Sequence, residues 1–249
     1  AEAIDATGAD VSVIFVPPPF ARAAALEAID IDAIEQAITG GVCEPVDFLT
    51  PLDDPEFYLG VDVQAGHVAA GLVVPRAEPE ADLARGLELR RAAIVVGPSG
   101  AGKSAIMWQT AYGLRHTVRW YRLLRMEQGD LAVLRRLLRT LRASADAPVG
   151  FVLDDIGRRG AEGWDALTRE LATIPGAVLL GSIREEDLFL LSGRSRVAEV
   201  RAEPENDLAR RIFDELKRSG KTKWSGWREP WAQSNGLVLE YTDRKSTRL

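Results

Sequence analysis

Short apolar runs recur through the second half of the chain, and amphipathic segments lie between them. The runs have the length of β-strands and cover residues 92–96, 118–123, 149–153 and 177–180. Residues 130–141 place leucines at helical spacing with arginines between them, which is the pattern of an amphipathic helix with a solvated basic face. Strands that alternate with helices predict an α/β fold with a mainly parallel sheet and right-handed crossovers.

The N-terminal part of the chain is less regular. Residues 11–16 form a β-branched run that three prolines stop, and residues 21–31 follow with a helical pattern. Gly40 and Gly41 then open a Pro- and Asp-rich stretch, 45–55, where an irregular connection and a domain boundary are expected. Weak strands are predicted at 58–63 and 69–74, followed by a charged helix at 80–90.

Residues 97–104 read GPSGAGKS and match the phosphate-binding pattern GxxxxGK[ST] at every fixed position. Small residues between a strand and a helix let backbone N–H groups converge on a phosphate, and the helix N-terminus adds positive charge. Lys103 is expected to act on the β- and γ-phosphates, and Ser104 to place its hydroxyl on Mg²⁺. The alternative is a Gly-rich turn that only connects the two elements. The predicted nucleotide-binding residues are Gly97, Pro98, Ser99, Gly100, Ala101, Gly102, Lys103, Ser104 and Ala105.

A second motif is the apolar strand at 150–153, which ends in Asp154 and Asp155. The carboxyl end of a parallel strand lies at the sheet edge where phosphate-binding loops gather, so this is the arrangement of a Walker B strand. Asp154 is expected to hold the Mg²⁺ shell, and Asp155 to orient or deprotonate the attacking water. The alternative is that the two acids only cap the following turn.

The next strand ends in polar and basic residues at the same edge. Ser182 and Arg184 are therefore candidates for sensing the γ-phosphate, and Arg184 is assigned to the catalytic set with Lys103 and Asp155. The alternative for Ser182 is to cap a helix that begins near Arg184, where two glutamates favour the positive helix end.

Composition narrows the function classes. The chain has 249 residues with 46% apolar content, enough for one full α/β core and part of a second unit. The net charge of −6 gives no overall attraction to nucleic acid or anionic membrane. Cys43 is the single cysteine, which fits a reducing compartment, and no apolar run approaches a membrane span, so a cytoplasmic location is the default expectation.

Together these motifs resemble the STAND class of P-loop ATPases, relatives of the AAA+ proteins, over residues 31–242. The residues that carry the resemblance are GPSGAGKS at 97–104, FVLDDI at 151–156, GSIREEDL at 181–188 and GWREPW at 226–231. The resemblance implies a three-layer P-loop NTPase sandwich followed by a truncated helical subdomain. It also implies ATP with Mg²⁺ rather than GTP, and a homo-oligomer through the NTPase domain. In the bacterial signalling or anti-phage proteins of this class, the domain is a switch between an effector and a sensor module. Gly236 stands where this class places a Gly-x-Pro turn near the phosphates, although the proline is absent here.

Residues 6–28 resemble a different family, the coenzyme-A-binding domain of the succinyl-CoA ligase alpha subunit, which indicates a chimeric junction. The expected organisation is a strand-loop-helix fragment at 1–30, a linker region at 31–90, the NTPase core at 91–202, a helical lid at 203–242 and a non-native tail at 243–249. The leading hypothesis is an ATP-hydrolysing switch. A nucleotide-binding scaffold without turnover and a CoA-ligase-related fragment remain as alternatives.

Overall fold

A computed structural model describes residues 34–127, 129–171 and 173–243 of the chain. The strand expected at 11–16, the helix expected at 21–31 and the segment that resembles the CoA ligase all lie outside these residues. Of the tail expected at 243–249, residues 244–249 lie outside them as well, and Asp243 is the last residue of a helix.

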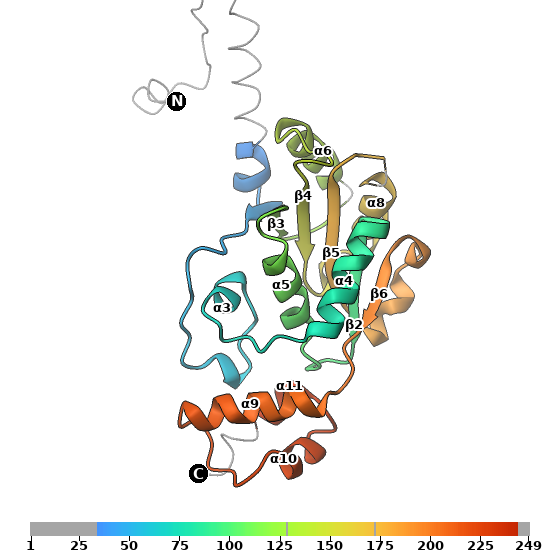
Figure 1. Cartoon of the computed structure of the whole chain (residues 1–249). Coiled ribbons are helices and arrows are strands. Elements are labelled where there is room, and N and C mark those ends of the chain that lie inside the picture. The colour runs from blue at the N-terminus through green and yellow to red at the C-terminus, as the bar shows by residue number, and fades with distance from the viewer. Residues whose placement is uncertain (1–33, 128, 172, 244–249) are drawn as a thin grey trace, which may run out of the picture.

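Six strands form one sheet in the order β1-β3-β4-β5-β2-β6 (Figure 1). All neighbouring pairs are parallel except β1 with β3. The four strands expected from the apolar runs are confirmed as β2 to β5, and β5 extends the expected strand to Arg184. The two edge strands were not predicted. The strands are β1 (Cys43–Pro45), β2 (Ala92–Gly97), β3 (Arg119–Leu123), β4 (Val149–Leu153), β5 (Ala177–Arg184) and β6 (Ala198–Arg201).

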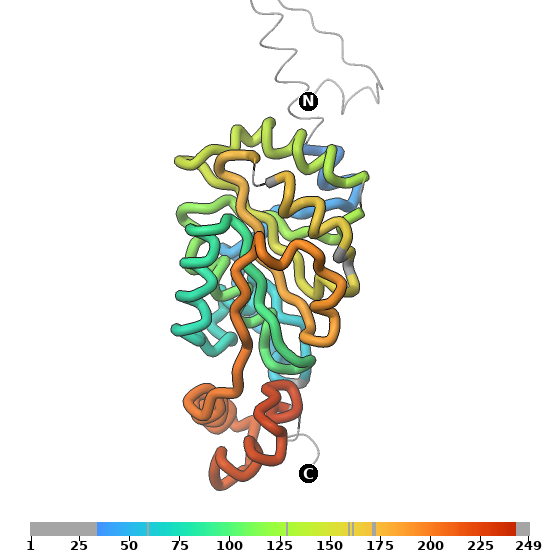
Figure 2. Tube along the Cα trace, turned by 90° about the vertical axis from the view of Figure 1, so that its right-hand side faces the viewer, coloured from blue at the N-terminus to red at the C-terminus, as the bar shows by residue number. Residues whose placement is uncertain are grey.

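Alternation along the strands divides the core between the two faces of the sheet. On β2, Ile94 and Val96 pack on one face, while Ala93 and Val95 pack on the other. The first face is covered by α6 (Asp130–Thr140), α7 (Ile156–Arg159) and α8 (Ala161–Leu171). The second is covered by α3 (Ala65–Ala69), α4 (Ala77–Arg90) and α5 (Lys103–Gly113). Figure 2 shows α4 and α8 on opposite sides of the strands, so the expected three-layer sandwich is confirmed.

A helical subdomain follows the sheet and lies below it in Figures 1 and 2. It contains α9 (Asn206–Arg218), α10 (Arg228–Gln233) and α11 (Val238–Asp243). These helices have their own small core, in which Trp231 and Tyr241 are buried together with the apolar face of α9. We call this subdomain the lid. Tryptophans are frequent between residues 224 and 231. Two of them, Trp224 and Trp231, belong to the core of the lid, because both pack against Tyr241.

The two weak strands predicted before α4 are wrong. The 3₁₀ helix η1 (Phe57–Leu59) and a non-strand segment occupy 58–63, and the end of α3, a turn and an irregular segment occupy 69–74. Gly60 and Gly71 have φ of 94° and 72°, which turn the chain where a strand would have to run straight. The apolar residues here instead pack against α5 and against the lid. No helix among the described residues has the length and apolar character that a membrane span requires.

Trp164 of α8 is expected to contribute strongly to the stability of the helix layer that packs on β5. It is fully buried, and a Cβ on Gly181 would lie 2.9 Å from its Cη2 atom, so the indole packs directly on β5. Trp164→Ala should lower the free energy of unfolding by about 3–5 kcal/mol, because it leaves a cavity that the sheet cannot close. Urea denaturation measures this. Leu89→Ala is the matched control, since Leu89 is 78% exposed and its loss should change stability by less than about 0.5 kcal/mol.

Candidate active site

The predicted phosphate-binding loop connects β2 to α5. Gly100 and Gly102 have φ of 81° and 84°, a left-handed conformation that favours glycine. Their backbone N–H groups have no acceptor among the described residues. The Lys103 Nζ atom folds back over the loop and donates to the Pro98 carbonyl at 2.8 Å. The loop therefore presents free amide donors and one ammonium group beside the N-terminus of a helix, which is a set of groups suited to an anion.

The carbonyl groups of the same loop are engaged by other parts of the protein. The Gly100 oxygen accepts a hydrogen bond from the Leu239 N–H of α11 at 3.0 Å. The Ala101 oxygen accepts one from Arg76 Nη1 at 3.2 Å. Because the carbonyls are held from the lid and linker, the loop is fixed in the orientation that leaves its amides available.

Asp154 joins the two sequence motifs. Ser104 Oγ donates to Asp154 Oδ1 at 2.9 Å, although the two residues lie 50 positions apart. Ser182 Oγ donates to the same oxygen. The register explains how Asp154 and Ser182 meet, because Leu153, the last residue of β4, pairs with Gly181, so Asp154 follows the end of β4 beside Ser182 of β5. The structure thus brings the expected metal residues, Ser104 and Asp154, into direct contact.

Ser182 does not cap a helix, so that alternative is wrong. The 3₁₀ helix η2 (Glu185–Leu190) begins after Arg184, which occupies its N-cap position without a side-chain cap. The hydroxyl of Ser182 instead accepts the Asp155 N–H at 3.0 Å and donates to Asp154. Ser182 is buried, and its hydroxyl contacts both Asp154 and Asp155.

Asp155 adopts φ of 53°, which turns the chain sharply at the strand end. Its Oδ2 atom lies 3.4 Å from Arg184 Nη2 and 3.4 Å from Arg158 Nε. Its Oδ1 atom is buried and has no hydrogen-bond partner among the described residues. The structure therefore brings Arg184 close to Asp155. Arg158, in contrast, has no local sequence signal and was missed.

A cavity of about 380 Å³ lies between these residues and the lid. One end is polar and is lined by the P-loop together with Asp154, Asp155 and Arg184. The part of the lining that comes from residues 57–74 and from the lid is mainly apolar, and we call it the apolar end. Its apolar residues are Phe57, Tyr58, Val61, Val63, Val73, Val74, Leu208 and Ile212, while Val238 of α11 lies beside Gly102 of the P-loop.

Sequence reasoning missed the apolar end of the cavity. Tyr58 belongs to the linker and Ile212 to α9, and each reads as an ordinary core residue in its own segment. Only the folded chain brings them to one cavity. Gly236 lies at the turn before α11, against Pro204, and the following Leu237 approaches Gly100 of the P-loop. The residue after Gly236 therefore lies near the phosphate-binding loop although the proline of the Gly-x-Pro turn is absent.

Comparison with known proteins identifies the fold. No protein-family profile matches the chain. A point variant of RuvB from Thermotoga maritima is similar with a TM-score of 0.50 and 16% identity, over 77% of this chain and 65% of that one. A Walker-type ATPase of Pyrococcus abyssi has a TM-score of 0.45 and 13% identity, over 68% of this chain and 65% of that one. PCH-2 of C. elegans has a TM-score of 0.39 and 13% identity, over 76% of this chain and 56% of that one.

The chain spans slightly less than two thirds of the length of the RuvB chain that it matches. At this identity the likeness concerns the fold alone. Together with the sheet order and the two motifs, it shows a P-loop NTPase fold.

Lys103 supplies a stability test of the site. Burial lowers the pKa of its ammonium group, Asp154 opposes this shift, and Arg184 adds to it. A base with a lowered folded-state pKa destabilises the fold while it is charged, and this cost disappears as the pH rises through the folded and unfolded values. Lys103→Met should therefore gain stability relative to the wild type at pH 7, and the gain should shrink as the pH rises from 7 toward 10.5, the ordinary lysine pKa. Urea denaturation across this range measures both, and a gain that grew with pH would contradict the desolvated position of Lys103.

Proposed function

We infer that the domain binds ATP with Mg²⁺ and hydrolyses it. The observation that carries this proposal is the hydrogen bond from Ser104 to Asp154, because it unites the P-loop and the acidic strand end in one oxygen-rich site. A Gly-rich turn that only connected a strand to a helix would not need this partner.

The residues present fit a triphosphate and its metal ion. The free amides of Gly100 and Gly102 and the Lys103 ammonium group would hold phosphate oxygens. Ser104 and Asp154 would hold Mg²⁺, which takes few protein ligands and fills its remaining positions with phosphate oxygens and water. When bound, the ion would neutralise charge on the phosphates.

The apolar end of the cavity suits the nucleobase. Tyr58 and Ile212 would place apolar surface against the ring, while the phosphates lie at the polar end. ATP is preferred to GTP because of the resemblance to STAND proteins and because the chain has no Asn-Lys-x-Asp guanine signature.

In the proposed reaction, Asp155 orients the attacking water and accepts its proton. Its Oδ1 atom has no hydrogen-bond partner among the described residues, while Oδ2 lies 3.4 Å from Arg158 Nε and from Arg184 Nη2. Water then forms the new bond to the γ-phosphorus as the bond to the β–γ bridging oxygen breaks. Arg184, at the end of β5, lies at the same edge of the sheet and would stabilise the negative charge that develops.

We place this activity in a nucleotide-operated switch of the STAND kind, with effector and sensor modules as partners and with self-association through the NTPase domain. Contact between the lid and the P-loop supports a switch, because a helical element touches the loop that would hold the phosphates.

A scaffold without turnover is the second candidate. It is favoured by the pairing of Asp155 with two guanidinium groups, which could keep the carboxylate from water.

Asp155→Asn should leave ATP bound and lower the single-turnover rate of hydrolysis by about 10²- to 10⁴-fold, the usual contribution of a general base. The amide keeps the shape of the side chain but cannot accept the proton. Phosphate release under single-turnover conditions and calorimetric ATP affinity are the measurements.

Glu185→Gln is the matched control, because this neighbouring acid pairs with Arg201 at the surface and has no role in the site. Its rate should equal that of the wild type. Equal rates for Asp155→Asn and the wild type would remove Asp155 from the reaction. If neither the wild type nor Asp155→Asn hydrolysed ATP, the domain would be a nucleotide-binding scaffold.

Asp154→Asn should have a different effect. Because this carboxylate is assigned to the metal, its loss should raise the Mg²⁺ concentration that gives half-maximal activity, and excess Mg²⁺ should restore part of the rate. A titration of activity against Mg²⁺ for the wild type and both Asn variants separates the two roles. If Asp155→Asn showed the metal defect and Asp154→Asn did not, the roles would be exchanged.

A further inference from the structure

Arg76 is a buried arginine at the junction of three segments. It precedes α4 and is 2% exposed. Its Nε and Nη2 atoms lie 2.7 and 2.6 Å from Glu205 Oε1, at the N-cap position of α9. Nη1 donates to Ala101 of the P-loop at 3.2 Å, and Nη2 also donates to the Glu203 carbonyl. One side chain therefore connects the linker, the P-loop and the beginning of the lid.

Packing alone does not explain this choice of residue. Removing a guanidinium group from water is costly unless its donors are paired, and an apolar side chain of similar volume would fill the space at lower cost. The planar fork of arginine does what such a side chain cannot, because it fixes the relative positions of several acceptors at once. Here those acceptors belong to the P-loop and to the lid.

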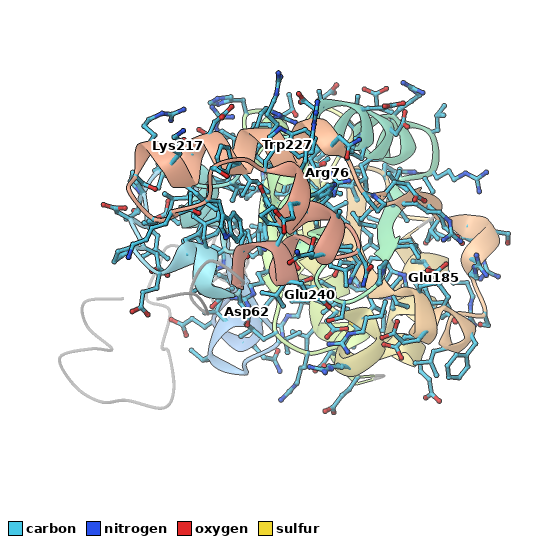
Figure 3. The ribbon with its side chains drawn as sticks, turned by 90° about the horizontal axis from the view of Figure 1, so that it is seen from below. Asp62, Arg76, Glu185, Lys217, Trp227 and Glu240 are labelled. Carbon is cyan, nitrogen blue, oxygen red and sulfur yellow. The ribbon has the colours of Figure 1, made fainter. Side chains whose placement is uncertain are left out.

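Other contacts place the lid against the same junction. Gly100, adjacent to Ala101, accepts the Leu239 N–H of α11. Arg211 of α9 donates to the Pro75 carbonyl at 2.6 Å, next to Arg76 but without reaching the P-loop. Figure 3 views this region from the lid side, with Lys217 and Glu240 on the lid and Arg76 on the adjoining linker.

We propose that Arg76 is a positioning residue that couples nucleotide binding at the P-loop to docking of the lid. This proposal rests on the proposed function, since it concerns the same nucleotide site. A nucleotide that holds the P-loop in one conformation holds the Ala101 carbonyl toward Arg76, and Arg76 then holds Glu203 and Glu205 at the base of α9. Coupling is reciprocal, so a docked lid must tighten nucleotide binding by the same factor.

The test compares Arg76→Met with Arg211→Met. Both replace an arginine that contacts the linker and the lid, but only Arg76 also contacts the P-loop. Hydrogen exchange is followed in α5 and in α9, with and without a saturating non-hydrolysable ATP analogue and Mg²⁺, and calorimetry gives the affinity. In the wild type and in Arg211→Met, the analogue should slow exchange in both helices.

In Arg76→Met the analogue should still protect α5, but its protection of α9 should be lost and its affinity should fall by about tenfold, within the usual range of coupling factors. If Arg76 had only a structural role, its replacement would reduce the protection of α5 and α9 from exchange to the same extent. Retained protection of α9 at saturation, or an equal loss in Arg211→Met, would overturn the proposal. A wild type that fails to bind the analogue would instead overturn the proposed function.

Glu205→Gln provides a second variant if Arg76→Met does not fold. The amide keeps one acceptor for the guanidinium group but removes the charge, so the Arg76 contact is weakened rather than deleted. The same loss of α9 protection is expected at smaller size, with α5 protected as before. Unchanged coupling in this variant would also overturn the proposal.

Discussion

The geometry of the site depends on the parallel alignment of β2, β5 and β4. Parallel strands end at the same edge, so the loop after β2 and the acids after β4 emerge side by side, with Ser182 of β5 between them. The hydrogen bond from Ser104 to Asp154 is the direct result. Any change that shifted the register of these strands would separate the two motifs before it altered either of them.

The parts that the sequence predicts are those whose signals are local. β2 and β4 are buried on both faces, so each is a continuous apolar run that stands out in the sequence. The P-loop is a contiguous motif with a fixed spacing. β1 and β6 were missed because they are short edge strands with mixed burial, and pairing with their neighbours rather than their own composition makes them strands.

The remaining parts of the site could not be predicted because their signals are not local. Arg76 and Glu205 are 129 positions apart, and nothing in either segment indicates the other. The linker was given two strands because its apolar residues resemble those of a sheet, whereas Tyr58 faces the core of the lid instead. The cavity is thus a composite of linker, sheet edge and lid, and only the sheet edge carries a recognisable motif.

The left-handed backbone at Asp155 restricts which residues can evolve there. At φ of 53° a β-branched or bulky side chain is strained, while aspartate, asparagine and glycine are tolerated. A longer acid such as glutamate would meet the same backbone cost. Few substitutions of Asp155 therefore avoid backbone strain. Homologues that drift there should carry asparagine or glycine, and by the chemistry assigned to the carboxylate such lineages would keep the nucleotide pocket while losing turnover.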